Sequence, residues 1–371
     1  MTPAAPPRTH GPHRVVVHNT DGVNPYSAEL ASLLHEEGLA VTLVDAANSE
    51  HAPARGVRWL RRLPENYGNR GGAAQFLSLA RGLATTVWVG AARRHVVLVS
   101  FTRFPVEDLV LAGLATLGHP VVVVVHNPEP REAESRLARG ARRALLRSAG
   151  TVVVHAERLR GRVDPVARGP VRVCPHPPYA HTAPPAEPAL VLDPERRWLA
   201  FIGALRWDKG AGLLPEVVEN LPPEQRGSLG LVVCGRGRLP DEAWERIRRT
   251  GVEVHDLTSE RPVPQETFLD VLRNHPLVLA PYVAATQSGS VIMALSTGCR
   301  VLAFDEGGIP DVLDAAGLVP TGDAAAMGRA AGAGRGGTAL ADLGTWRRQA
   351  AETWAEAVRC VDRPSTQRRG G

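Results

Sequence analysis

Short apolar runs rich in β-branched residues recur along the chain, and a helical pattern follows each of them. A continuous apolar run predicts a strand buried on both faces, as in a parallel sheet covered by helices. The predicted strands of the first half are residues 14–19, 39–45, 95–101, 120–126, 151–155 and 171–176. Those of the second half are residues 198–203, 229–235, 251–255, 276–281 and 299–304. The pattern predicts an α/β protein with two tandem Rossmann-like, doubly wound domains.

The alternation is interrupted once, by a proline-rich stretch at residues 175–195 that predicts an interdomain linker. We place the first domain at residues 1–180, the linker at 181–195, the second domain at 196–342, and a last helix with a tail at 343–371. That helix is expected to cross back to the first domain. Parallel sheets bind ligands beyond the carboxyl ends of their strands, so the site is expected in a cleft between the two facing domains.

Composition narrows the classes of protein. The chain has 371 residues, 44% of them hydrophobic, which is enough for two sizeable cores. A net charge of only +5 and 5% aromatic residues argue against nucleic-acid binding. Four widely spaced cysteines without a CxxC pair indicate reduced thiols rather than a zinc site. No apolar run approaches the ~20 residues of a membrane span, so we expect a cytoplasmic protein with at most peripheral membrane contact.

The segment GALRWDKG, residues 203–210, holds Lys209, the only lysine of the chain. It follows a predicted strand and leads into a helix, whose N-terminal N–H groups favour an anion. Arg206 offers a planar fork for two phosphate oxygens, and Lys209 offers a compact point charge. The two residues predict a phosphate site, although one exposed lysine can also persist by chance.

A second loop, within residues 285–298, follows predicted strand 276–281 and opens a helix. Its small, hydroxylated and glycine residues would let the backbone press against a diphosphate. They are Thr286, Gln287, Ser288, Gly289 and Ser290. A plain helix N-cap explains the same pattern, because serine and glycine are common at helix starts.

Several segments in this order resemble the nucleotide-sugar half of GT-B glycosyltransferases. They are AFIGALRWDKGAGLL, VVCGRG and PYVAATQSGSVIMALSTGCRVLAFDEGGIPDVL. The likeness is to the large, mostly retaining family that includes bacterial mannosyltransferases and sucrose synthases. In the first half, VVVVVHNPEPRE is similar to the HNxxPHE stretch of one bacterial subgroup, with Arg131 in place of the second histidine. The resemblance covers most of residues 120–315.

The resemblance implies that the first domain binds the acceptor and the second binds the nucleotide sugar. Arg206 and Lys209 would bind the donor diphosphate and stabilise it as it leaves, with backbone contacts from residues 286–290. Gly307 and Gly308 would shape the loop after predicted strand 299–304. No DxD triplet occurs in the chain, so we expect neither a metal nor a cofactor beyond the nucleotide sugar itself.

His126 would lie at the sugar end of the cleft as a catalytic residue, by the same resemblance. On local grounds a lone histidine at the end of an apolar strand is more often a structural cap.

The chain departs from the family at one point. Two glutamates eight residues apart are usual, the second holding the ribose, and here Ala285 and Met293 occupy those positions. Neither side chain can accept a ribose hydrogen bond, so Asp305 or Glu306 would take over. Whether the anomeric configuration is retained is therefore open.

The loop at residues 18–30 follows the first predicted strand and is expected to face the acceptor. Gly22 permits a close turn, and Asn24 can cap the helix that follows. We expect the acceptor contacts to come from Gly22, Asn24, Tyr26, Asn127 and Glu129. Asp21 is the candidate base if the reaction inverts, but turn formation is the more common role of such an aspartate.

Residues 136–148 predict a helix with a basic face. Its arginines at positions 136, 139, 143 and 147 share one side, opposite Leu137, Ala141 and Leu145. Such a face could meet anionic lipid or an acidic acceptor. A solvated surface is the more common outcome in a chain this rich in arginine.

Taken together, these features predict an enzyme that transfers a sugar from a nucleotide-diphosphate sugar to a hydroxyl or thiol of a small-molecule or saccharide acceptor. GDP is slightly favoured over UDP, and bacterial specialised metabolism is the expected setting. A nicotinamide oxidoreductase is rejected, because NTDGVNPY rather than GxGxxG follows the first strand. A sugar-nucleotide epimerase of the same architecture and a non-catalytic anion-binding protein remain as alternatives.

Overall fold

In the computed structural model, the chain is described over residues 13–65, 72–93, 95–127, 135–179 and 190–361. Within these residues, the first half forms a seven-stranded parallel sheet in the order β3-β2-β1-β4-β5-β6-β7. Its strands are β1 (Arg14–Asn19), β2 (Ala40–Ala46), β3 (Arg58–Leu63), β4 (Val96–Phe101), β5 (Val121–Val124), β6 (Thr151–Val154) and β7 (Val171–Val173). Its helices are α1 (Tyr26–Glu36), α2 (Ala73–Arg93), α3 (Pro105–Thr116), α4 (Arg136–Ser148) and α5 (Glu157–Val163).

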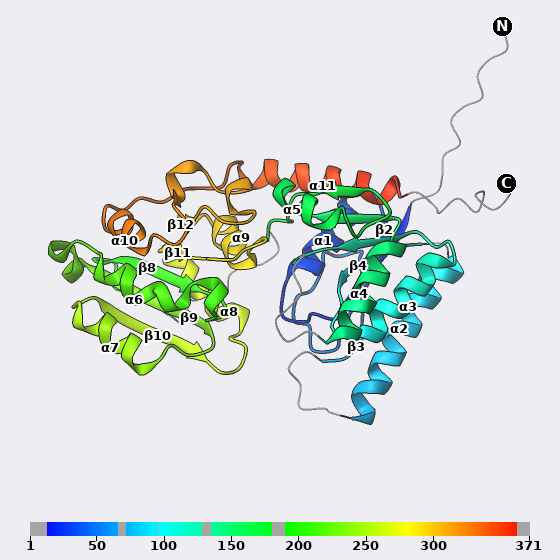
Figure 1. The fold of residues 1–371 in the computed structure, drawn as a ribbon, viewed down its shortest axis with the longest axis horizontal. Coiled ribbons are helices and arrows are strands. Elements are labelled where there is room, and N and C mark those ends of the chain that lie inside the picture. The colour runs from blue at the N-terminus through cyan, green and yellow to red at the C-terminus, as the bar shows by residue number, and fades with distance from the viewer. Residues whose placement is uncertain (1–12, 66–71, 94, 128–134, 180–189, 362–371) are drawn as a thin grey trace, which may run out of the picture.

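The described residues of the second half form a six-stranded parallel sheet in the order β10-β9-β8-β11-β12-β13. The strands are β8 (Arg197–Ile202), β9 (Leu229–Arg236), β10 (Glu253–Ser259), β11 (Leu277–Ala280), β12 (Val301–Phe304) and β13 (Leu318–Val319). The helices are α6 (Leu214–Glu219), α7 (Asp241–Arg249), α8 (Gln265–Arg273), α9 (Gly289–Ser296), α10 (Ala324–Gly332) and α11 (Leu343–Arg359). The predicted α/β class with two parallel sheets is confirmed (Figure 1).

Both sheets reverse their strand order at an equivalent place. The first strand of each sheet pairs with the second on one side and with the fourth on the other, so the switch lies between β1 and β4 and between β8 and β11. Helices leave neighbouring strands in opposite directions there, which opens a crevice at the carboxyl ends. The loops after β1, β4, β8 and β11 are therefore the places to look for a ligand.

Two strands fall outside the sequence prediction. β3 is an edge strand with the sequence RWLRRL, and most of its side chains are only partly buried or exposed. β13 has two residues and forms the edge of the second sheet beside β12. Edge strands need no continuous apolar run, so the criterion that located the buried strands could not locate these two.

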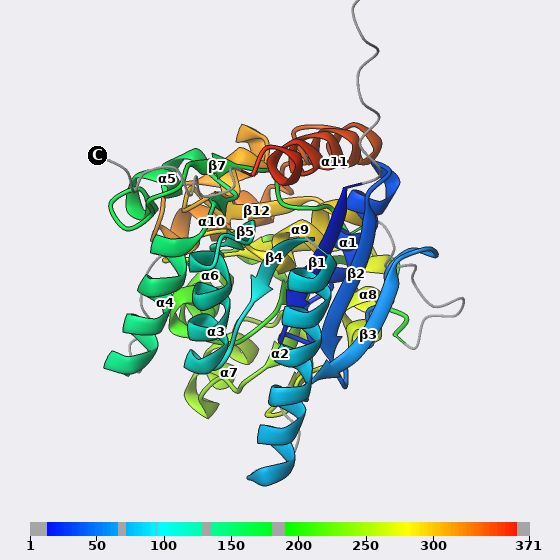
Figure 2. The same ribbon diagram turned by 90° about the vertical axis from the view of Figure 1, so that its right-hand side faces the viewer.

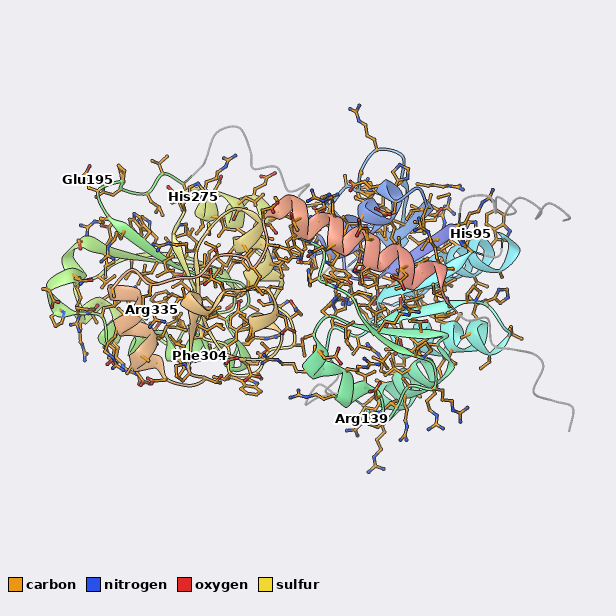
Figure 3. All side chains as sticks on the ribbon, turned by 90° about the horizontal axis from the view of Figure 1, so that it is seen from above. His95, Arg139, Glu195, His275, Phe304 and Arg335 are labelled. Atoms are coloured by element: carbon orange, nitrogen blue, oxygen red, sulfur yellow. The ribbon has the colours of Figure 1, made fainter. Side chains whose placement is uncertain are left out.

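Helix α11 joins the two halves. In Figure 1 it runs along the top of the molecule from the boundary between the two halves over the first sheet, and Figure 3 shows the same course from above. The indole of Trp346 donates to the His176 carbonyl at 3.0 Å, and that of fully buried Trp354 donates to the Pro175 carbonyl at 2.9 Å. Arg347 bonds Glu36 of α1 at 2.6 Å. The helix thus fixes the segment that leads from the first sheet towards the second.

No described helix is both long and apolar enough to cross a membrane. The domain boundaries drawn from the sequence stay a prediction, and most of the predicted linker lies outside the described residues.

Substitution of Trp354 by phenylalanine should destabilise the protein by about 2 kcal/mol or more. The change leaves the half-buried Pro175 carbonyl without its donor and opens a small cavity at the buried indole position. Urea unfolding measures the effect, with Trp207→Phe as the control. Trp207 is 67% exposed, so its replacement should change the free energy of unfolding by less than about 0.5 kcal/mol. Equal losses in the two variants would show that the indole bond of α11 contributes little.

Candidate active site

The loops after β8 and β11 are packed against each other at the switch of the second sheet. Gly210 has a φ of 64°, and a Cβ atom there would lie 1.8 Å from the Pro281 carbonyl oxygen. Only glycine permits this approach. The amides of Val283 and Ala284 donate to the Asp208 carbonyl at 3.1 and 3.2 Å. Segment 203–210 is thereby held against the start of the loop that leads into α9.

Lys209 is half-buried, and its ammonium lies 4.1 Å from the centre of the Tyr282 ring. This cation–π contact partly replaces the water that the charge has lost. The buried Tyr282 hydroxyl hydrogen-bonds with Ser288 and Ser290, at the start of α9. The ring therefore links the ammonium to the positive end of a helix, where an anion would meet both.

Burial lowers the pKa of Lys209 to about 8, and the nearby Asp208 carboxylate offsets only part of that shift. A half-buried cation whose burial is only partly offset by a neighbouring carboxylate is stabilised when it binds an anion. This electrostatic state supports the ligand class expected for Lys209.

The sequence predicts an Arg206 guanidinium that binds phosphate oxygens, but in the structure this group is already paired with a carboxylate. Its Nε and Nη2 atoms donate to the two carboxylate oxygens of Asp208 at 2.9 and 2.6 Å. The guanidinium is 57% exposed at the rim of the loop. It would have to leave Asp208, or share it, in order to reach a phosphate, so Lys209 is the stronger candidate of the two.

Side chains of the 286–290 loop form hydrogen bonds within the protein instead of facing a ligand. Ser288 is buried and caps α9 by accepting the Val291 amide, so the N-cap explanation applies to it. Thr286 donates to the His126 carbonyl, and Gln287 donates to the Gly308 carbonyl at 3.2 Å. The groups left to face an anion are the N–H groups of the first helical turn, around Gly289 and Ser290.

Gly307 and Gly308 pack against this loop. Gly307 has a φ of 56°, and a Cβ atom there would lie 1.7 Å from the Ala285 carbonyl oxygen. The Gly308 amide donates to the Thr286 carbonyl at 2.7 Å. Both glycines thus have a packing role, which is what shaping the loop requires.

The two positions where glutamates would be expected are apolar and buried. Ala285 and Met293 belong to the hydrophobic core around α9. Asp305, one of the two proposed replacements, lies 3.7 Å from Arg158 of α5, so it pairs across the two halves. Glu306 follows it and is half-buried. Both acids lie at the carboxyl end of β12, on the side of the sheet where a ligand would bind.

His126 follows β5 and lies among aromatic rings. It stacks on Phe101 with centroids 3.9 Å apart, and Tyr26 meets it edge-on at 4.6 Å. Burial, reinforced by His155 and His176, holds the pKa of His126 well below its usual range. Its Nε2 atom is shielded from solvent and has no hydrogen-bond partner among the described residues. A neutral imidazole with one nitrogen unused can bind a hydroxyl group.

Sequence reasoning missed the other members of this ring cluster. His155 follows β6 and hydrogen-bonds the Cys174 carbonyl at 3.0 Å, and burial lowers its pKa to about 4. His176 and Tyr179 come from the segment after β7 and are also buried. The signal was present, since TVVVH ends an apolar strand with histidine just as VVVVVH does.

The loop after β1 is held by its own side chains. Asp21 accepts the Val23 amide at 3.1 Å. This is the turn contact that the sequence analysis gave as the alternative to a role as catalytic base. Asn24 accepts the Tyr26 amide at 3.0 Å and the Tyr179 hydroxyl at 2.9 Å. Gly22 is buried, and a Cβ atom there would lie 2.9 Å from that of Ala46.

Of the remaining acceptor candidates, Tyr26 is fully buried in the ring cluster and Asn127 is exposed. Glu129 and Arg131 lie outside the described residues.

Asn24 and Tyr179 bring the first half close to α9. A Cβ atom on Gly289 would lie 3.1 Å from the Tyr179 hydroxyl and 3.5 Å from Asn24 Nδ2. The Thr286 bond to the His126 carbonyl crosses the same boundary. The loops after β1, β5 and β11 therefore converge, and the structure brings Asn24 and His126 next to the start of α9.

Comparison with known proteins identifies the second half. Residues 196–333 match the family described as "Glycosyl transferases group 1". No curated protein matches the chain in sequence.

Solved structures with a similar fold extend over nearly the whole chain. Sucrose-phosphate synthase from Thermosynechococcus elongatus is 16% identical with a TM-score of 0.63, over 94% of this chain and 95% of its own. Anabaena HepE, solved with UDP, is 15% identical with a TM-score of 0.58, over 94% and 96%. The trehalose 6-phosphate synthase of Burkholderia multivorans is 14% identical with a TM-score of 0.54, over 95% and 94%. Residues 196–333 therefore match a glycosyl transferases group 1 domain, and the chain as a whole has the two-sheet fold of these solved structures.

Proposed function

We propose that the enzyme binds the diphosphate of a nucleotide sugar between Lys209 and the first turn of α9 and transfers the sugar to a hydroxyl acceptor in the cleft. The observation that carries this proposal is the contact of the half-buried ammonium with Tyr282, whose hydroxyl bonds Ser288 and Ser290. This contact places the ammonium and the positive end of α9 next to the same position. A diphosphate supplies the charge that both of them lack.

Departure of the nucleoside diphosphate places growing negative charge on the oxygen that leaves the anomeric carbon. The Lys209 ammonium and the free N–H groups of α9 are already in place to stabilise that charge. A preorganised donor of this kind is typically worth about 3 kcal/mol, or a hundredfold in rate. Protein cations would thus replace the metal used by other glycosyltransferases.

His126 of the first half adjoins this region, because its carbonyl accepts a hydrogen bond from Thr286. With its pKa held well below the usual range, it carries no charge that would oppose the positive character developing on the sugar ring. Its Nε2 atom has no partner among the described residues, and a movement that uncovers it would let it hold a sugar hydroxyl and orient the anomeric carbon. The role of His126 is therefore positional binding of the sugar through one hydrogen bond.

Uracil is the base that we propose for the donor nucleotide. HepE was solved with UDP and with UDP-glucose, and the trehalose-phosphate synthase of Burkholderia vietnamiensis is described as UDP-forming. These relatives favour UDP over the GDP suggested by the sequence resemblance. For the acceptor we propose a hydroxyl of a small molecule or saccharide, and a role in specialised metabolism stays a prediction.

A thermal-shift screen with UDP, GDP, ADP and dTDP tests the donor class. A ligand that binds only the folded state raises the unfolding temperature in proportion to its binding free energy. We expect UDP to give the largest shift and UMP a much smaller one, because the second phosphate would lie beside Lys209. A larger shift with GDP than with UDP would contradict the choice of base, and no shift with any diphosphate would contradict the site.

Replacement of Lys209 should reduce transfer at least a hundredfold. Lys209→Met is the informative variant, because it keeps the chain that packs on Tyr282 and removes only the charge. Arg329→Met, at an exposed position on α10, is the matched control. Sugar transfer is measured alongside urea unfolding, which should be nearly unchanged in both variants. Turnover like that of wild type in a folded Lys209→Met enzyme would contradict the assignment.

The depressed pKa of Lys209 predicts that diphosphate affinity falls as the pH rises. Burial lowers this pKa to about 8, so the group is mostly charged at pH 7 and mostly neutral at pH 9. Calorimetry should therefore show UDP binding about tenfold more weakly at pH 9 than at pH 7. The Lys209→Arg variant stays charged throughout and should show a flat profile. A flat profile for wild type would mean that the ammonium does not contact the diphosphate.

A further inference from the structure

Arg206 and Asp208 form an ion pair at the rim of the proposed diphosphate site. The Nε and Nη2 atoms of Arg206 donate to the two carboxylate oxygens of Asp208 at 2.9 and 2.6 Å. Two parallel bonds from one guanidinium are also the usual way in which an arginine binds a phosphate group. The carboxylate therefore occupies the part of Arg206 that a phosphate would use.

The two partners differ in how freely they can move. The main chain of Asp208 is held in place, since its carbonyl accepts the amides of Val283 and Ala284 at 3.1 and 3.2 Å. Its short side chain is 21% exposed, whereas the Arg206 side chain is 57% exposed on a longer and more flexible stem. A change of partner would thus move the guanidinium and leave the carboxylate where it is.

The Asp208 carboxylate acts on the same groups that would meet the diphosphate. Burial lowers the pKa of Lys209, and Asp208 opposes that shift while Arg206 adds to it. Burial raises the pKa of Tyr282, and here Asp208 adds to the shift while Arg206 opposes it. Both charges are therefore within electrostatic range of the ammonium and of the ring that it contacts. A diphosphate that binds there meets one fixed negative charge as well as two positive ones.

The ion pair is weak enough to be exchanged. An exposed arginine–carboxylate pair changes an equilibrium constant by no more than about fivefold, because water competes for both charges. A diphosphate carries more negative charge than one carboxylate and offers the guanidinium the same two bonds. Arg206 can therefore leave Asp208 for a phosphate at a small cost in free energy.

We propose that Asp208 is a stand-in for the donor diphosphate: it holds Arg206 in the free enzyme, and the incoming nucleotide sugar displaces it from the guanidinium. The inference rests on the proposed function and adds to it a residue that sets donor affinity. Asp208 is a positioning residue, because it acts through Arg206 and through the charge of Lys209. It keeps the guanidinium at the rim and favours the protonated ammonium until the diphosphate arrives, and it lowers donor affinity in doing so.

The chain contains a matched ion pair away from this site. Arg246 of α7 donates its Nε and Nη2 atoms to Glu219 at 2.8 and 2.6 Å, which is close to the geometry of the Arg206–Asp208 pair. The two side chains are 48% and 37% exposed. Helix α7 lies apart from α9 in Figure 1 and in Figure 2. Neutralising Glu219 therefore breaks an equivalent ion pair without changing the donor site.

Calorimetry with UDP and with pyrophosphate tests the proposal at pH 6, where Lys209 is charged. Asp208→Asn should bind both ligands about three- to tenfold more tightly than wild type, because the competing charge is gone and the diphosphate is the part that they share. Glu219→Gln should bind both ligands like wild type. Urea unfolding should be nearly unchanged in the two variants. Equal or weaker binding by a folded Asp208→Asn protein, or an equal gain in Glu219→Gln, would overturn the proposal.

The pH dependence of UDP binding gives a second readout, which a purely structural role of Asp208 would not move. Asp208 raises the pKa of Lys209, so removal of the carboxylate charge should let the ammonium lose its proton at a lower pH. The pH at which UDP affinity falls should therefore be lower in Asp208→Asn than in wild type, and unchanged in Glu219→Gln. The same pH in all three proteins would contradict the action of Asp208 on Lys209.

A crystal structure of the UDP complex decides whether the exchange takes place. The Arg206 guanidinium should lie about 3 Å from a phosphate oxygen and should no longer hydrogen-bond Asp208. A guanidinium that stays on Asp208 in the complex would overturn the proposal. Wild type that binds neither UDP nor pyrophosphate would remove the proposed function and this inference with it, whereas binding that Asp208→Asn leaves unchanged would remove this inference alone.

Discussion

A lysine ammonium drawn partly out of water is the feature on which the proposed chemistry depends. Burial of a charge is costly unless a partner is near, and Lys209 has the face of Tyr282 and the neighbouring Asp208 as incomplete compensation. A guanidinium would be too large and too flat to occupy the same place with the same contacts. This explains why a chain that otherwise uses arginine has kept one lysine here. An incoming diphosphate would restore the lost solvation, so the unfavourable burial in the free enzyme becomes binding energy.

At that position three loops approach each other more closely than side chains would allow. Gly210 against Pro281 and Gly307 against Ala285 bring the ends of β8, β11 and β12 into one compact surface. The strand order places these ends at the switch of the sheet, where the backbone leaves room for a ligand. Thr286, in the loop before α9, bonds the His126 carbonyl after β5. Tyr179 of the first half lies beside Gly289 and bonds Asn24 in the loop after β1. The site is thus a property of both sheets, with α11 holding the connecting segment in place.

The sequence predicted the buried strands well and the individual side chains less well, for a physical reason. Parallel strands covered on both faces must be apolar throughout. Continuous apolar runs in the sequence therefore identify β1, β5, β8 and β11. A polar side chain on a loop has several local partners available, and its choice depends on contacts that are distant in sequence. Arg206 bonds Asp208 two residues away, while Thr286 bonds a carbonyl 160 residues away. Asp21 formed the turn that its position favours, whereas the ring cluster around Tyr26 needs four separate segments to assemble.

The two halves of the chain contribute different charges to the proposed site. The second half presents a cation and a helix N-terminus, while the first half presents histidines kept neutral by burial among aromatic rings. Protonation of those rings would place positive charge where a sugar acquires positive character, and would set it against the Lys209 ammonium near the diphosphate. In the proposed complex, neutral imidazoles would leave the positive charge concentrated on the leaving-group side of the sugar.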